Sequence, residues 1–148
     1  MKKLFFLLSF LLLGLSVSFA QTRAYKYLYS VKDDVKIPGS LSKGTIHYFT
    51  FTDNGNKCYL TNKDGMYRGA YGQHSYKYIG KKNGVLIYKE QNQNILREGE
   101  DMLYFSSDLK KMNRQSWMDN YFPESRGCTQ VYEYVADPNA VDVPSQLY

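Results

Sequence analysis

Hydrophobic and polar residues alternate over several short stretches after residue 20, which is the pattern of β-strands with one buried face. In residues 25–32 every second position is a tyrosine or a valine, and this strand could continue over 35–37 before Pro38-Gly39 breaks the chain. The same alternation predicts strands over 102–106 and 129–135. The chain is therefore expected to be rich in short strands.

Residues 45–62 predict a β-hairpin. Two segments rich in aromatic and β-branched residues flank Asn54-Gly55, the residue pair that favours a type I′ turn. A two-residue turn fixes the register and places Phe51 opposite Cys58. A slip of one residue would scatter the apolar residues over both faces, so the turn and the pattern support each other.

Residues 75–91 predict a second hairpin, with Asn83-Gly84 at its turn. With a two-residue turn, Ile79 is expected to lie opposite Tyr88. Both faces of this hairpin carry apolar residues, which suits a central position in a sheet or a barrel with a filled interior.

The remaining segments complete the predicted fold. Residues 95–97 could form a short strand, and Ser107-Asp108 offers an N-cap for at most a short helical segment near 108–113. Residues 113–128 look irregular. Together the segments give about seven or eight short strands joined mostly as hairpins, which is typical of an all-β antiparallel meander. We expect a closed barrel rather than a sandwich.

Residues 1–20 have the features of a cleavable secretory signal peptide. Two lysines precede an uncharged apolar run over 4–15, and Ser18 and Ala20 place small residues at the positions that a signal peptidase reads. Cleavage is therefore expected between Ala20 and Gln21, and the protein is expected to be periplasmic or secreted.

A retained membrane anchor is the alternative, because residues 4–22 carry no charge and approach the roughly 20 residues that span a bilayer. Gly14 and Ser16 weaken that apolar run and favour cleavage. Cleavage leaves one all-β domain over 21–138, a C-terminal tail over 139–148, and no stable membrane span.

Loss of the leader lowers the formal net charge from +5 to +3, since it removes Lys2 and Lys3 and no acidic residue. The other charges are interspersed, whereas nucleic-acid binding needs a clustered basic patch. We therefore expect no nucleic-acid partner. All 15 tyrosines follow residue 20, and tyrosine suits strand positions that are half buried.

The two cysteines of the chain, Cys58 and Cys128, both lie after the leader. Export implies a compartment in which disulfides persist, and two cysteines in an exported chain usually pair. A disulfide would close a loop of about 70 residues and stabilise the fold by about 4 kcal/mol. The sequence therefore predicts a disulfide, with two separate thiols as the alternative.

The sequence contains no pattern typical of a catalytic, nucleotide-binding or metal site. His47 lies within a predicted strand and is expected to be buried and hydrogen-bonded. His74 follows a glycine-rich stretch, but no Cys, Asp or second His stands at ligand spacing, so neither a metal site nor a cofactor is expected. Glu98, Glu100 and Asp101 form an acidic cluster, which is either a solvated turn or the carboxylates of a hydrolase.

Two stretches could carry a binding surface. Residues 62–73 are long for a hairpin connection and contain tyrosines beside an arginine, which suit recognition of a sugar or a peptide. Residues 113–127 contain aromatic side chains that would either cap the barrel or form an exposed patch. The candidate ligand-binding residues are Tyr67, Arg68, Tyr71, His74 and Trp117.

These patterns favour an exported binding or interaction module whose partner is a small molecule, a glycan or another envelope protein. The alternatives are a hydrolase of the cell envelope that uses carboxylates, and a purely structural or inhibitory envelope protein. A hollow barrel lined by tyrosine would indicate a small ligand, whereas a filled one would direct attention to the two long stretches.

Overall fold

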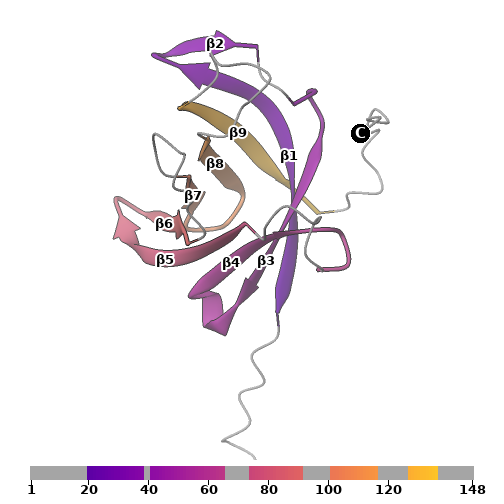
Figure 1. The fold of residues 1–148 in the computed structure, drawn as a ribbon, viewed down its shortest axis with the longest axis vertical. Helices are drawn as coiled ribbons and strands as arrows, with labels where there is room; N and C mark the ends of the chain where they lie inside the picture. The colour runs from indigo at the N-terminus through magenta and orange to yellow at the C-terminus, as the bar shows by residue number, and fades with distance from the viewer. Residues whose placement is uncertain (1–19, 39–40, 66–73, 92–100, 117–126, 137–148) are drawn as a thin grey trace, which may run out of the picture.

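The computed structural model describes residues 20–38, 41–65, 74–91, 101–116 and 127–136, and about two thirds of them lie in nine β-strands (Figure 1). The alternation of apolar and polar residues accounts for these strands. Their bounds are β1 (Gln21–Lys32), β2 (Val35–Ile37), β3 (Ile46–Thr52), β4 (Lys57–Thr61), β5 (Ser75–Lys82), β6 (Val85–Glu90), β7 (Met102–Ser106), β8 (Lys111–Ser116) and β9 (Cys128–Val135).

The strands form a closed antiparallel barrel. The sheet order is β2-β1-β3-β4-β5-β6-β7-β8-β9, and an additional pairing of β1 with β9 closes the barrel. Eight strands therefore make up the barrel, while the short β2 extends it as the partner of the end of β1. The predicted all-β class is confirmed, and the barrel rather than the sandwich is formed.

The long strand β1 makes the closure possible because it pairs with different neighbours along its length. Residues 21–26 pair with β3, whereas 24–31 pair with β9. A bulge between Tyr27 and Tyr29 shifts the register, and such bulges bend and twist a strand. Figure 1 shows β1 as the long curved strand that crosses the molecule between β3 and β9.

Aromatic side chains fill most of the barrel interior. Phe105 lies at the centre of the group, with ring centroids 5.2 Å from Phe51, 5.5 Å from Tyr25 and 5.6 Å from Tyr88. Most of these pairs meet edge to face or tilted, the arrangements that aromatic rings prefer. The interior at this level is a packed core rather than a hollow cavity.

The first predicted hairpin is confirmed. Phe51 lies opposite Cys58, and both side chains are buried. Asn54 and Gly55 have φ values of 51° and 85°, as a type I′ turn requires, and Asn56 N donates to Asp53 O at 2.9 Å. The turn residues therefore set the register that buries one apolar face.

The second hairpin forms with the predicted register from the turn to Gly80, opposite Ile87, but the predicted register is wrong beyond that point. A bulge between Tyr78 and Gly80 leaves Ile79 without a cross-strand partner, so Tyr78 rather than Ile79 lies opposite Tyr88. Ile79 is 54% exposed. The bulge turns Tyr78 toward the core and Ile79 toward solvent, which a simple two-residue alternation cannot predict.

The sequence allowed at most a short helical segment near 108–113; none forms there, and β8 begins at Lys111 instead. Asp108 accepts hydrogen bonds from Ser106 Oγ at 2.6 Å and from Lys110 N at 3.0 Å, and the hydroxyl bond lowers the pKa of Asp108. Leu109 has a φ of 57°. The aspartate thus stabilises a tight β7–β8 turn rather than capping a helix.

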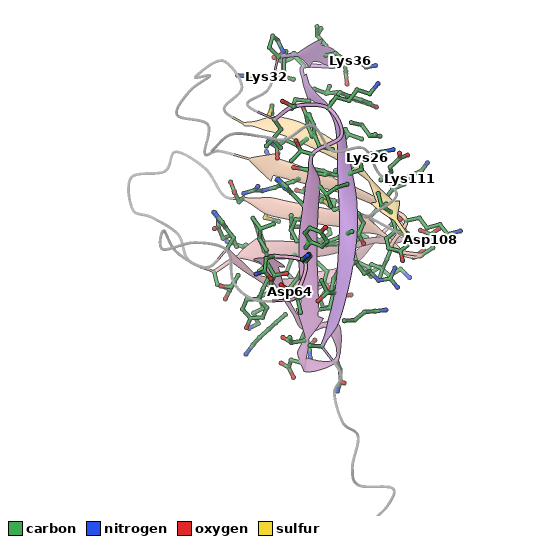
Figure 2. The ribbon with its side chains drawn as sticks, turned by 90° about the vertical axis from the view of Figure 1, so that its right-hand side faces the viewer. Lys26, Lys32, Lys36, Asp64, Asp108 and Lys111 are labelled. Carbon is green, nitrogen blue, oxygen red and sulfur yellow. The ribbon has the colours of Figure 1, made fainter. Side chains whose placement is uncertain are left out.

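The outer face carries many of the charged side chains, of which Figure 2 labels Lys26, Lys32, Lys36, Asp64, Asp108 and Lys111. Lys26 Nζ lies 2.7 Å from Glu133 Oε1 across the β1–β9 pair. Both side chains are partly exposed, so the ion pair contributes little to stability.

The predicted disulfide is wrong. Cys58 on β4 and Cys128 on β9 are both buried and neither forms a disulfide. In the barrel, β3 and β1 separate these strands on one side, and β5 to β8 separate them on the other. Burial raises the pKa of the Cys58 thiol well above its usual value, which makes this thiol unreactive in the folded protein.

The predicted leader and tail lie outside the described residues, while Ala20 is exposed and β1 begins at Gln21. Among the residues that the structure describes, there is no helix with the length and hydrophobicity needed to cross a membrane. The predicted strand over 95–97 also falls outside the described part.

We expect the intact mass of the exported protein to equal that of the chain from Gln21 onward with both cysteines as thiols. Thiol reagents should label Cys58 and Cys128 only after denaturation, since both are buried. Mass spectrometry with and without denaturant measures both properties. A mass two hydrogens lower, or a melting temperature that falls on reduction, would contradict the separate thiols.

Buried tyrosines should make the fold sensitive to alkali. Burial raises the pKa of Tyr88 to about 12 and raises those of Tyr25, Tyr76 and Tyr132 further. An unfolded tyrosine ionises near pH 10. The folded state therefore holds these protons more tightly, and the stability they contribute is complete below about pH 10 and lost as pH rises toward 12.

Ionisation of each buried tyrosine should lower the free energy of unfolding by up to about 1.4 kcal/mol per pH unit between about pH 10 and pH 12. Urea unfolding at increasing pH measures this loss, and tyrosinate absorbance reports the ionisation. We expect several tyrosines to ionise together with unfolding. If all tyrosines ionised independently near pH 10 while the barrel stayed folded, the predicted link between tyrosine ionisation and unfolding would be wrong.

Candidate functional site

The two ends of the barrel are joined differently. Tight turns connect β3 to β4, β5 to β6 and β7 to β8 at one end, whereas β4–β5, β6–β7 and β8–β9 have longer connections. Because neighbouring strands are antiparallel, the three longer connections start and finish at the same end. We call this the long-connection end. Both stretches singled out in the sequence, 62–73 and 113–127, therefore attach to one end of the barrel.

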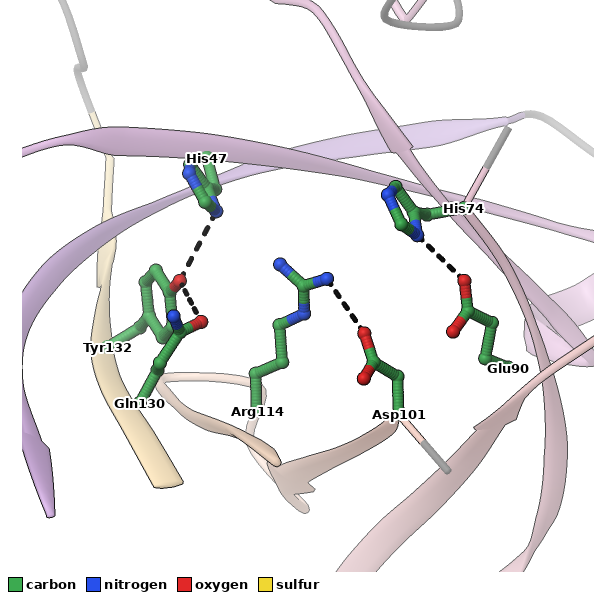
Figure 3. A network of polar contacts seen from close by, with 7 residues as sticks. All are labelled: His47, His74, Glu90, Asp101, Arg114, Gln130 and Tyr132. Carbon is green, nitrogen blue, oxygen red and sulfur yellow. Dashed lines mark hydrogen bonds and ion pairs between the residues drawn. The ribbon is translucent and has the colours of Figure 1, made fainter. Parts of the chain in front are cut away.

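Seven polar side chains lie together at the long-connection end (Figure 3). They come from β3, β6, β8, β9 and the residues just before β5 and β7, so strands that are distant in the sequence supply them. Most of them are buried. This polar cluster consists of His47, His74, Glu90, Asp101, Arg114, Gln130 and Tyr132.

A histidine–carboxylate pair forms one part of the polar cluster. His74 Nδ1 lies 2.7 Å from Glu90 Oε1. The side chain of His74 is 24% exposed, whereas that of Glu90 is 1% exposed. The carboxylate is thus held inside the barrel while the imidazole reaches toward its rim, with Nε2 as its remaining ring nitrogen.

A buried ion pair forms the second part. Arg114 Nη2 donates to Asp101 Oδ2 at 2.9 Å, and the side chains are 9% and 0% exposed. Arg114 extends from β8, and Asp101 immediately precedes the paired strand β7. Arginine remains protonated under all ordinary conditions, so Asp101 lies beside a permanent positive charge.

The third part is a hydrogen-bonded chain around Tyr132. Its hydroxyl donates to Gln130 Oε1 at 3.0 Å and lies 3.3 Å from His47 Nδ1. The hydroxyl has one proton to give, so while it donates to Gln130 its oxygen can accept a hydrogen bond from His47 Nδ1. His47 is buried and hydrogen-bonded as expected from the sequence.

Two buried donors next to these groups have no partner within the described structure: the Tyr76 hydroxyl and Arg114 Nε. Tyr76 is 1% exposed and lies directly opposite Glu90 in the β5–β6 pair. Burial raises its pKa, with further contributions from the charges of Asp101 and Glu90. The hydroxyl therefore stays protonated and able to donate.

Buried donors without an acceptor are rare in folded proteins, and each usually indicates a bound water, an ion or a ligand. Here the donors lie beside two buried carboxylates and an imidazole. The polar cluster can therefore both donate to and accept from a bound group.

The structure also offers depressions that the charged residues of the cluster do not line. One of about 440 Å³ lies at the tight-turn end between Phe51, Tyr88 and Leu86 and is largely apolar. Another of about 420 Å³ lies along the strands near Tyr29 and Val131. Neither contains a buried charge, so neither has the chemical character of the long-connection end.

The structure describes one of the five candidate ligand-binding residues predicted from the sequence. His74 belongs to the polar cluster, whereas Tyr67, Arg68, Tyr71 and Trp117 lie outside the described residues. Of the acidic cluster in the sequence, Asp101 is described and is fully buried rather than solvated.

Sequence reasoning missed the roles of two cluster residues. Glu90 ends an alternating strand at a position where the pattern predicts an inward-facing side chain, so a charged residue there was a usable signal. Arg114 lies in a segment that looked irregular. Sequence spacing also could not show that the fold brings Glu90 and Asp101 close to His74 from distant positions.

Comparison of the chain with protein-family models, with curated proteins and with solved structures gave no match. The polar cluster itself is therefore the basis for a functional proposal.

Replacing Arg114 with Met should destabilise the protein by about 3–5 kcal/mol, because it leaves the Asp101 carboxylate buried without its cation. Asp101→Leu should have a similar effect by leaving Arg114 unpaired. The double variant should be more stable than the less stable single variant, because neither charge remains buried. Urea unfolding of the four proteins measures this coupling.

Additive losses in the double variant would show that the two side chains do not act as a pair. Asp108→Asn is a suitable control, since Asp108 is an exposed acid and its replacement should change stability far less.

Proposed function

We propose that the protein is an exported binding protein that holds a small hydroxyl-rich ligand, such as a sugar or the end of a glycan, at the long-connection end of the barrel. The observation that carries this proposal is the pair of orphan donors, Tyr76 Oη and Arg114 Nε, beside the buried carboxylates of Glu90 and Asp101. Export follows from the signal-peptide pattern of residues 1–20.

The cost of burying these groups supports a functional role. Removing an ionised group from water costs several kcal/mol, and a buried ion pair is often no more stable than apolar side chains of the same volume. The rest of the interior shows that aromatic residues fill this barrel well. The charged residues at one end are therefore better explained by recognition than by stability.

The chemistry of the cluster matches a hydroxyl group. A hydroxyl donates one hydrogen bond and accepts up to two. It could donate to Glu90 or Asp101 and accept from Tyr76 or Arg114. A ligand with several hydroxyls would give the Tyr76 hydroxyl and Arg114 Nε an acceptor, whereas an apolar ligand would leave these two donors without one and be rejected.

A carboxylate-dependent hydrolase is the second candidate, favoured by carboxylate oxygens of Glu90 and Asp101 that lie within 4.8 Å of each other. Glycosidases use two nearby carboxyl groups, one of them protonated. In this cluster Asp101 accepts a hydrogen bond from Arg114, and Glu90 lies 2.7 Å from the His74 imidazole. Both carboxyl groups are thus already engaged by basic side chains, so binding is the better-supported function.

The test uses a pair of matched variants, Tyr76→Phe and Tyr88→Phe. Tyr76→Phe removes a hydroxyl that has no partner in the described structure, so the stability should be kept or slightly increased. Tyr88→Phe removes a hydroxyl that donates to Gly55 O at 2.7 Å at the tight-turn end and should cost about 1 kcal/mol.

A panel of monosaccharides and disaccharides is titrated into each protein by calorimetry. We expect the wild type to bind at least one sugar of the panel and to release none of it as a hydrolysed product. Tyr76→Phe should weaken that affinity roughly 5- to 10-fold, which corresponds to about 1 kcal/mol. Tyr88→Phe should keep the wild-type affinity despite its lower stability.

Binding of no sugar at millimolar concentration would overturn the proposal. So would a Tyr76→Phe variant with unchanged affinity, because the ligand would then lie elsewhere. Cleavage of a bound disaccharide that is lost in Glu90→Gln would establish the hydrolase instead.

A further inference from the structure

We infer that His74, Glu90 and Asp101 form a binding site for one divalent metal ion at the long-connection end of the barrel. Each residue offers one ligand atom, and these atoms all lie within 4.8 Å of one another. The two carboxyl groups are buried and the imidazole is partly exposed. This arrangement holds the ligands inside the barrel and leaves a route to them from the rim.

The chemical nature of the ligands suits a transition metal of intermediate softness. Imidazole nitrogen and carboxylate oxygen bind Zn²⁺ at about 2.0–2.2 Å, and sites with three protein ligands leave a position open for water or substrate. Imidazole and carboxylate also bind other first-row divalent ions such as Mn²⁺ and Co²⁺. The cluster lacks a cysteine, so it has no preference for ions that require sulfur.

The geometry needs little adjustment to hold an ion. Ligands about 2.1 Å from a tetrahedral ion lie roughly 3.4 Å from one another. His74 Nδ1 and Glu90 Oε1 are 2.7 Å apart in a hydrogen bond, so they would separate by less than 1 Å. No pair of ligand atoms is more than 4.8 Å apart, so any other pair would approach by at most about 1.4 Å. His74 immediately precedes β5 and is partly exposed, and its side chain can make that movement without disturbing the core.

The charge of the cluster also favours a cation. Glu90 and Asp101 contribute two negative charges close together, and Arg114 neutralises one of them. A divalent ion at this place would bring positive charge beside the two carboxylates, and the imidazole of His74 would bind it in its neutral form.

The Tyr76 hydroxyl is a second, independent indication of a ligand at this place. It is buried, has no partner in the described structure, and comes from the residue directly opposite Glu90 in the sheet. A water or a hydroxyl group bound to the ion would be an acceptor for this donor. The orphan hydroxyl is then explained by a metal-bound oxygen rather than by a defect in packing.

Arg114 would act on the ion through Asp101 rather than directly. A carboxylate has about four lone-pair sites on its two oxygens, so Asp101 can keep its bond to Arg114 Nη2 and also bind the ion. Hydrogen bonds of this kind orient metal ligands and commonly change affinity 10- to 100-fold. Arg114 is therefore a positioning residue for Asp101.

The metal site shares its residues with the proposed sugar site, but it does not require a sugar. An ion held by three protein ligands would present its open positions to the hydroxyl groups of a ligand. The inference therefore deepens the proposed function, and it is tested in the absence of any sugar so that the two can fail separately.

The test uses the exported full-length protein without a polyhistidine tag, stripped of metal with EDTA and dialysed. Zn²⁺, Mn²⁺ and Co²⁺ are titrated separately by calorimetry, and the bound metal is counted by elemental analysis. We expect one ion per chain for at least one metal. The visible absorption of bound Co²⁺ should show nitrogen and oxygen ligands.

Three variants probe the site and one variant is the control. His74→Ala and Glu90→Gln should each lower the affinity at least 10-fold, and Asp101→Asn should do the same if its fold is intact by circular dichroism. Asp108→Asn is the matched control, because Asp108 is an exposed acid in the β7–β8 turn, away from the polar cluster. Its affinity should equal that of the wild type.

Failure of all three ions to bind at millimolar concentration would overturn the inference. Equal affinity in His74→Ala and Glu90→Gln would also overturn it, because the ion would then be bound elsewhere on the chain. Sugar binding by EDTA-treated protein that binds no ion would overturn the metal site and leave the proposed function standing. Ion binding without sugar binding would support the metal site and overturn the proposed function.

Discussion

The pairing of the first barrel strand with the last is the constraint on which the rest of the structure depends. Without the β1–β9 contact the sheet would have two long open edges, and its aromatic face would be exposed. β1 achieves this closure because the bulge after Tyr27 bends it, so that one strand serves two neighbours. The closed interior then has two regions: an aromatic core and, at the long-connection end, the polar cluster.

These two regions contribute oppositely to the stability of the fold. The rings around Phe105 contribute burial of apolar surface and favourable edge contacts, whereas the charges of Glu90, Asp101 and Arg114 must be removed from water. The barrel tolerates that cost because the aromatic core holds the strands in place. It also keeps the polar side chains rigid, since each comes from a strand or from a residue next to one, and rigid placement favours selective binding.

Local signals in the sequence predicted much of the fold. The Asn54-Gly55 turn and the alternation beside it give the correct β3–β4 register, because both depend on neighbouring residues. The bulge at Ile79 has no comparable signal, and the predicted register beyond it was wrong for that reason. The polar cluster was harder still: residues that meet inside it come from separate strands, so only the closed barrel brings them together. The absent disulfide has the same origin, since barrel topology, not sequence distance, separates Cys58 from Cys128.

The order of the strands also determines when the barrel can close during synthesis. Ala24 near the start pairs with Val135 near the end, so the barrel cannot close until almost the entire chain has left the ribosome or a translocation channel. The hairpins with tight turns can form early because their contacts are local, while closure waits for the most distant contact. Until then the aromatic face is open, and a chain truncated before β9 would remain a curved sheet with an exposed edge, prone to association with its own copies.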